Sequence, residues 1–222
     1  MYGVLLRADD VLRARPRLVR GGHHARRLML LSILMILFAG FYGAVMGSYG
    51  GARWLQMLYS GIKAPLLFTA TFMLSLPSFF VINTLFGLRH DFAESLRALV
   101  ATQAGLTIVL ASFAPFTVLW YVSFGSYDAA KMFNLFMFGV ASISAQRLLH
   151  QFYQPLLERD PRHRTLLRIW LVIFAFVGIQ MGWVLRPFVG NPVAPTQFFR
   201  DEAWGNAYVE VGQTLWRLAS GS

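Results

Sequence analysis

The sequence contains no cysteine, so disulfide bonds, thiolate nucleophiles and cysteine-ligated metal sites are all excluded. Charged residues are scarce as well: they make up 14% of the chain, whereas soluble domains carry about 25%. Hydrophobic residues, by contrast, account for 56% of the 222 positions. These proportions indicate that lipid, rather than water, surrounds most of the chain.

Sequence motifs for catalysis are also missing. The chain has no HExxH motif, no Walker-type loop, no GxSxG nucleophile elbow and no carboxylate in the middle of an apolar run. Its histidines stand near arginines, without the spacing of a metal site, and are His23, His24, His90, His150 and His163. We therefore expect no catalytic residue, no metal site and no cofactor, and a non-enzymatic protein is favoured over a membrane enzyme.

The net charge of +10 does not indicate nucleic-acid binding, because the basic residues cluster between apolar runs and form no stripe with aromatics between them. Residues 1–27 form a basic arm in which a short amphipathic helix is predicted before Pro16. We expect this arm to lie in the cytoplasm against anionic lipid headgroups. Recruitment of a soluble partner is the alternative.

Five runs are apolar enough to cross a bilayer, which requires about 20 residues each. They cover residues 28–47, 62–85, 98–123, 129–149 and 165–186. The fourth run is the least hydrophobic, and the basic stretch from Arg147 to Arg168, broken by Pro155 and Pro161, predicts a loop. The sequence thus predicts an all-α membrane protein, a five-helix transmembrane bundle over residues 28–187 with amphipathic interfacial helices at both ends.

Two spans carry small residues at four-residue spacing, which on a helix form a face that another helix can approach closely. These helix-packing candidates are Ala39, Gly43 and Gly47 in the first span and Gly178 and Gly182 in the last.

Polar residues inside the spans are candidates either for hydrogen bonds between helices, the favoured reading, or for the lining of a pore. They are Asn83, Gln103, Asn134 and Gln180. Just before the third span, Asp91 and Glu94 have the spacing of a capping box, which predicts a helix start there.

The segment from Gly178 to Pro192 combines the last glycine face with Arg186, and Pro187 disfavours helix at that arginine. One interpretation is an interfacial anchor in which Arg186 snorkels beside Trp183. The other pairs Arg186 with a lipid phosphate or with Asp128, Asp201 or Glu202. The tail that follows, residues 188–222, is predicted to be an external amphipathic segment with Trp204 and Tyr208 at the interface.

Charge distribution predicts the orientation of the spans. With the amino terminus in the cytoplasm, most basic residues lie inside, as the positive-inside rule requires. The external segments then hold only Arg53, Lys63, Lys131, Arg186, Arg200 and Arg217. We therefore expect a multi-pass protein of the bacterial inner membrane with a cytoplasmic amino terminus and an external carboxy terminus.

A resemblance adds to this interpretation. The segments PLLFTATFMLSLPSFFVINTLFGL, QMGWVLRPFVGNP and FFR…WGNAYVEV, within residues 60–212, resemble a family of uncharacterised bacterial integral membrane proteins that are loosely comparable to the Yip-type five-span proteins. The resemblance implies a five-helix inner-membrane bundle with no established catalytic activity. The chain has no clear counterpart of the Yip signature motifs, so no GTPase-binding role is carried over.

These observations favour a scaffold or accessory subunit of a membrane assembly. Its expected partners are the bilayer and other membrane proteins or a second copy of the chain. The alternative is a small-solute or ion channel or carrier, formed by one chain or by an oligomer.

Overall fold

The structure is a computed structural model that describes residues 2–15, 24–51, 53–193, 195–199 and 209. Regular secondary structure in these residues is entirely helical, and five segments are long and apolar enough to cross a membrane. The predicted all-α, five-span fold is therefore confirmed. The helices in chain order are α1 (Tyr2–Leu12), α2 (His24–Met46), α3 (Trp54–Leu85), the short 3-10 helix η2 (Arg89–Asp91), α4 (Phe92–Ser112), α5 (Ala114–Ser123), α6 (Tyr127–Arg159) and α7 (Arg162–Val184).

Several boundaries differ from the predicted ones. α3 begins at Trp54 instead of near residue 62, and the third span breaks at Phe113 into α4 and α5. The predicted loop over 147–168 is wrong, because α6 continues to Arg159 with Pro155 inside it and α7 begins at Arg162. Charged residues mark where a helix leaves the hydrocarbon, not where it ends, since its backbone hydrogen bonds persist in the headgroup region.

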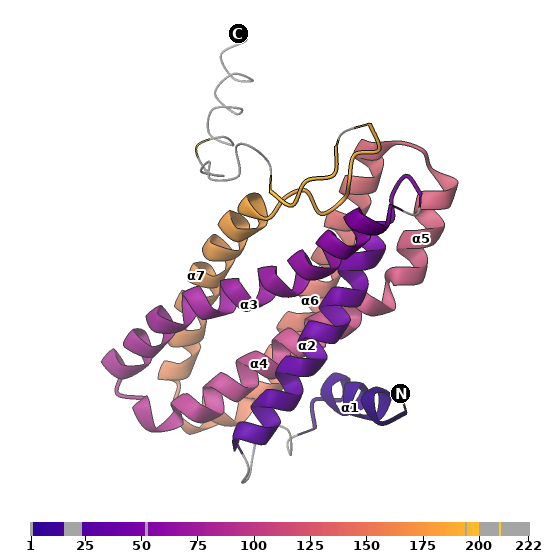
Figure 1. The fold of residues 1–222 in the computed structure, drawn as a ribbon. Helices are drawn as coiled ribbons and strands as arrows, with labels where there is room; N and C mark the ends of the chain where they lie inside the picture. The colour runs from indigo at the N-terminus through magenta and orange to yellow at the C-terminus, as the bar shows by residue number, and fades with distance from the viewer. Residues whose placement is uncertain (1, 16–23, 52, 194, 200–208, 210–222) are drawn as a thin grey trace.

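The bundle is an open ring of helices (Figure 1). The largest contacts run from α7 to α3, from α3 to α2, from α2 to α4 and from α4 to α6. α6 and α7 touch only slightly, so a seam separates the fourth and fifth spans. The short α5 packs beside α2 and α6, on the outside of the ring.

α4 belongs to the most buried of the five spans, and its sequence is rich in small residues. Ala98, Ala101 and Ala104 are fully buried, and Gly105 lies so close to α6 that an added Cβ would come within 2.4 Å of the Leu148 side chain. Small side chains let neighbouring helices approach α4 on more than one side. α4 thus lies on the inner side of the seam between α6 and α7.

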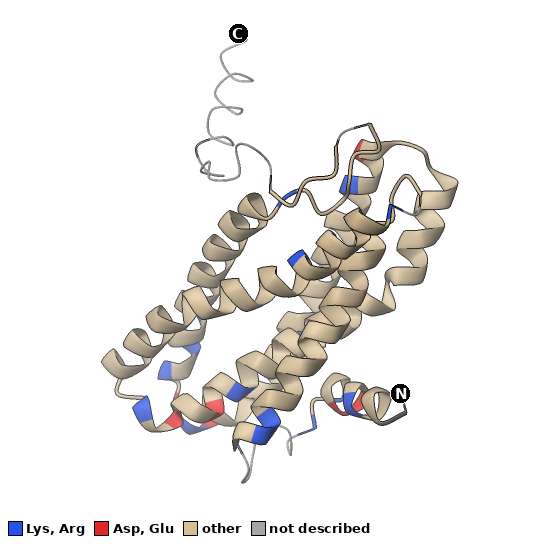
Figure 2. Cartoon of the chain, in the orientation of Figure 1, with Lys and Arg blue, Asp and Glu red and all other residues tan. Residues whose placement is uncertain are grey.

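The predicted amphipathic helix of the basic arm is present as α1. It packs on α4 through Ala8 and Val11, which are buried, while Leu5 and Leu6 on its other side are exposed. Charged side chains gather on α1 and at the end of the bundle where η2 joins α4 (Figure 2). We name this end the Asp91 end, and the opposite end the Arg186 end.

The predicted carboxy-terminal interfacial helix lies outside the described residues. Its two aromatic candidates, Trp204 and Tyr208, are therefore not placed. The same holds for Asp201 and Glu202, two of the proposed partners of Arg186.

Candidate functional site

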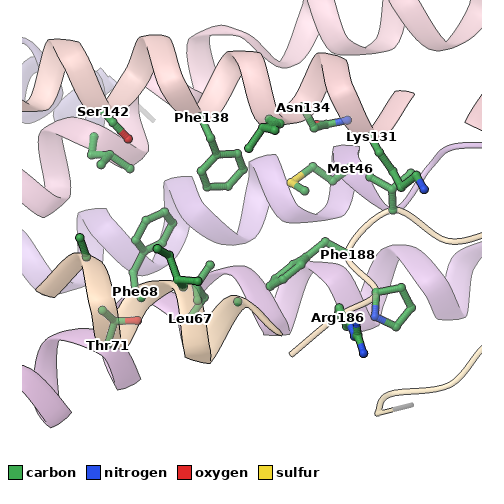
Figure 3. A pocket seen from close by; sticks show the side chains of 18 of the residues that line it. Met46, Leu67, Phe68, Thr71, Lys131, Asn134, Phe138, Ser142, Arg186 and Phe188 are labelled. Carbon is green, nitrogen blue, oxygen red and sulfur yellow. The ribbon is translucent and has the colours of Figure 1, made fainter. Parts of the chain in front are cut away.

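The seam between α6 and α7 contains a cavity of about 720 Å³ (Figure 3). α3 and α4 form its inner side, and the segment after α7 closes it at the Arg186 end. We call it the α6–α7 groove. It exists because α7 rests on α3 and leaves α6 almost untouched.

The walls of the groove are mostly apolar. Phe68 of α3, Phe138 of α6 and Phe174 of α7 line it, together with Phe188 from the segment beyond α7. The α7 wall is shallow because Ala175, Gly178 and Gly182 carry little or no side chain. The small residues of α7 therefore leave room for the groove at this seam.

The two predicted glycine faces behave differently. In α2, Ala39 is buried, and an added Cβ would come within 2.3 Å of the Ser60 carbonyl oxygen at Gly43 and within 2.7 Å of the Gln56 carbonyl oxygen at Gly47. The first-span face therefore packs directly against α3.

The last-span face makes no such close contact. An added Cβ at Gly178 would only touch the Thr71 methyl group, at 3.4 Å, and at Gly182 it would meet nothing within 4 Å. The expectation of close packing at Gly182 is corrected: its bare face borders the groove.

Two cations stand at one end of the groove, on opposite sides of it (Figure 3). Lys131 Nζ lies 2.7 Å from the exposed carboxylate of Asp128 and 4.7 Å from the centre of the Tyr127 ring. The Arg186 guanidinium carbon lies 3.3 Å from the centre of the Trp183 ring. Arg186 and Trp183 thus stack as the anchor interpretation expects, while Asp128 pairs with Lys131.

Of the four polar residues predicted inside the spans, Gln103 and Asn134 line the groove. Asn134 is held by hydrogen bonds: its amide donates to Tyr121 Oη at 2.6 Å and to the Ala130 carbonyl, and it accepts from Tyr42 Oη at 3.1 Å. It therefore joins α2, α5 and α6, as the favoured interpretation expects.

The other two polar candidates lie apart from the groove. Asn83 is fully buried in α3 toward the Asp91 end, and neither of its side-chain polar atoms has a hydrogen-bond partner among the described residues. Gln180 is half-buried on α7. Neither residue is among those that line the groove, so the four predicted polar residues do not line one common pore.

The segment after α7 crosses the Arg186 end of α3 as a strap, residues 185–191. Ser60 Oγ donates to the Phe188 carbonyl at 2.5 Å, Lys63 Nζ donates to the Pro187 carbonyl at 3.0 Å, and Tyr127 Oη donates to the Val189 carbonyl at 3.0 Å. These bonds satisfy backbone carbonyl groups that have no hydrogen-bond partner within a helix. They also hold Phe188 in the groove wall.

The polar anchors of the strap were missed by sequence reasoning. Gln56, Ser60 and Lys63 are buried and recur at i, i+4 and i+7, a polar stripe on a span that is otherwise apolar. That periodicity is a visible signal, because a buried polar stripe on a membrane helix requires partners.

A second polar cluster joins α4, α6 and α7 at the Asp91 end. The Asp91 carboxylate accepts from the Arg159 guanidinium and lies 3.2 Å from His163 Nε2. His163 Nδ1 lies 3.4 Å from Tyr153 Oη, which donates to Ser95 Oγ at 3.0 Å. The capping-box expectation is wrong in its mechanism, because Asp91 makes no side-chain cap bond and instead binds these distant residues.

This cluster contains serine, histidine and aspartate but cannot act as a hydrolytic site as it stands. Ser95, Tyr153 and His163 are fully buried, and a tyrosine separates the serine from the histidine. A nucleophile needs its base in direct hydrogen-bond reach and access to substrate. Among the described residues no group of three or more metal-binding side chains comes together either.

Comparison of the chain with models of known protein families, with curated proteins and with solved structures yielded no match. The features of the molecule that bear on its function are the groove, the strap and the exposed face of α7.

Proposed function

We propose that this chain is a non-enzymatic integral membrane protein that acts as a scaffold or accessory subunit of a membrane assembly. The observation that carries the proposal is the one-sided attachment of α7. This helix packs mainly on α3 and is the least buried of the five spans, with Val172 and Ile179 exposed. A spanning helix with so much exposed apolar surface is suited to bind a further helix, from another membrane protein or from a second copy.

The absence of cysteine makes a cross-linking test direct. A single cysteine at Phe176, carrying a photoactivatable label, is expected to capture a protein partner in native membranes. The matched control is Phe41→Cys on α2, since the two phenylalanines are almost equally exposed, at 57% and 56%. The expected result is a cross-linked species from α7 that is at least several-fold stronger than from α2.

Two results would contradict the scaffold proposal. One is an equal, background level of cross-linking from both positions. The other is solute flux through proteoliposomes that is lost in Gln103→Ala, which would support the channel or carrier alternative, because Gln103 lines the groove.

We further propose a location in the bacterial inner membrane, with the Asp91 end in the cytoplasm and the Arg186 end outside. The accumulation of charge at the Asp91 end supports this orientation through the positive-inside rule (Figure 2). The resemblance to bacterial inner-membrane proteins supports the location.

The orientation can be tested by thiol labelling in intact cells. His90→Cys lies in η2 at the Asp91 end, and Gly125→Cys lies between α5 and α6 at the Arg186 end, where an added Cβ meets nothing within 4 Å. A membrane-impermeant maleimide is expected to label position 125 and to reach position 90 only after permeabilisation. The reverse pattern would overturn the proposed orientation.

A further inference from the structure

The α6–α7 groove opens sideways, toward where the lipid tails lie. Leu135 on α6 and Ile179 on α7 line it and are also more than half exposed. In a bilayer, apolar side chains at such an opening contact acyl chains. A hydrocarbon chain therefore has a path from the membrane into the groove without crossing any helix.

The size of the groove favours a chain-like occupant over a helix. An α-helix with its side chains is about 10 Å across, so a volume of 720 Å³ would hold a piece only about 9 Å long. The same volume lies within the range of roughly 300–1,000 Å³ for pockets that bind small molecules. A second cavity of about 260 Å³ continues toward Trp170 and shares Gln103, Ser142 and Phe174 with the first.

The charge at the mouth selects the sign of the headgroup. Lys131 and Arg186 both line the groove, whereas no carboxylate of the described residues does. Asp128 pairs with Lys131 at 2.7 Å and is 85% exposed at its side chain, so it offsets one of these two positive charges. The Arg186 end of the groove is therefore positive on balance and suits an anionic group such as a phosphate.

Two buried polar atoms mark a second contact point deeper in the groove. Thr71 Oγ1 and Gln103 Oε1 are buried and have no hydrogen-bond partner among the described residues, although buried polar atoms are nearly always paired. The Thr71 hydroxyl can donate to an ester carbonyl, and the Gln103 amide can do so after a half-turn of its terminal group.

The distance of this second contact point from Arg186 matches the distance between the phosphate and the ester groups of a phospholipid. Thr71 lies beside Gly178, and the Arg186 guanidinium stacks on Trp183. Trp183 follows Gly178 by five positions along the helix, a rise of about 7.5 Å. A glycerophospholipid likewise carries its ester carbonyls a few bonds below its phosphate.

We propose that the α6–α7 groove binds one phospholipid with an anionic headgroup. The phosphate lies between Lys131 and Arg186, the ester region contacts Thr71 and Gln103, and an acyl chain follows the groove toward Trp170. This site is additional to the scaffold role and does not depend on it.

Native mass spectrometry of the purified protein in mild detergent, with added phosphatidylglycerol or phosphatidylcholine, tests the site. The wild type is expected to retain one phosphatidylglycerol in preference to phosphatidylcholine. Each cation near a headgroup contributes a factor of roughly five, so the double variant Lys131→Gln/Arg186→Gln should bind phosphatidylglycerol about 30-fold more weakly. Its binding of phosphatidylcholine should change less.

Gly182→Leu should fill the groove and reduce the binding of both lipids. The matched control is Gly139→Leu on α6, since an added Cβ at either glycine meets nothing within 4 Å but only Gly182 lines the groove. Equal lipid retention by these two variants, or no preference for phosphatidylglycerol in the wild type, would overturn the proposal by showing only surface lipid. Should Gly182→Leu fail to fold, the double charge variant still decides the outcome.

Discussion

Gly43→Ala is expected to lower the unfolding free energy by about 2 kcal/mol, because it forces an extra atom into a closely packed helix contact. The new Cβ would come within 2.3 Å of the Ser60 carbonyl oxygen and within 2.7 Å of the Ala64 Cβ atom. The first of these is a backbone atom, so no side-chain rotation relieves the clash. α2 and α3 must separate, and for a chain of this size the midpoint of thermal unfolding in detergent should fall by roughly 4–8 °C.

The separation has a second consequence at the strap. Ser60 and Gln56, which face Gly43 and Gly47, also donate hydrogen bonds to the Phe188 carbonyl oxygen. Displacement of α3 therefore loosens the segment that forms the groove wall. Gly43→Ala should also weaken lipid retention, although Gly43 lies outside the groove.

Gly139→Ala is the control for the change of residue type. An added Cβ at Gly139 meets nothing within 4 Å, and alanine is the better helix former by about 1 kcal/mol. Its stability should equal or exceed that of the wild type. Unchanged thermal unfolding in both variants would contradict the contact between α2 and α3.

The glycine positions show how far sequence reasoning reaches. Four-residue spacing correctly places Gly43 and Gly47 on one face, and the same argument places Gly178 and Gly182 on another. The spacing shows that a helix has a bare face but not whether a second helix lies against it. That depends on which spans become neighbours, and here α7 joins α3 and leaves its glycines beside a groove.

The polar clusters show the same limit. Because Asn134 lies in an apolar run, the sequence predicts that it forms a hydrogen bond to another helix. It does not predict the partners, Tyr42 and Tyr121, which come from two other helices. Asp91 fits a local capping rule in the sequence, yet its partners lie 68 and 72 residues away. Local patterns thus predicted helices and polar positions, whereas the groove depends on contacts between distant segments.

Asp91→Ala is expected to destabilise the bundle by about 2 kcal/mol, since it removes the acceptor shared by Arg159 and His163. His163 is fully buried, so water cannot replace the lost bond. Through His163, Asp91 is also connected to Tyr153, which donates a hydrogen bond to Ser95. Loss of the carboxylate thus weakens the whole chain of bonds.

Asp91→Asn tests whether the negative charge of the Asp91 side chain contributes to stability beyond its shape. It keeps an acceptor oxygen for Arg159 or His163 but no negative charge, so its loss of stability should lie between that of Asp91→Ala and zero.

Tyr153→Phe removes the hydroxyl that links His163 to Ser95 and should destabilise by about 1 kcal/mol. Because these changes share one network, the double variant Asp91→Ala/Tyr153→Phe should lose less than the sum of its parts. Strict additivity in thermal unfolding would show that the two ends of the network act independently.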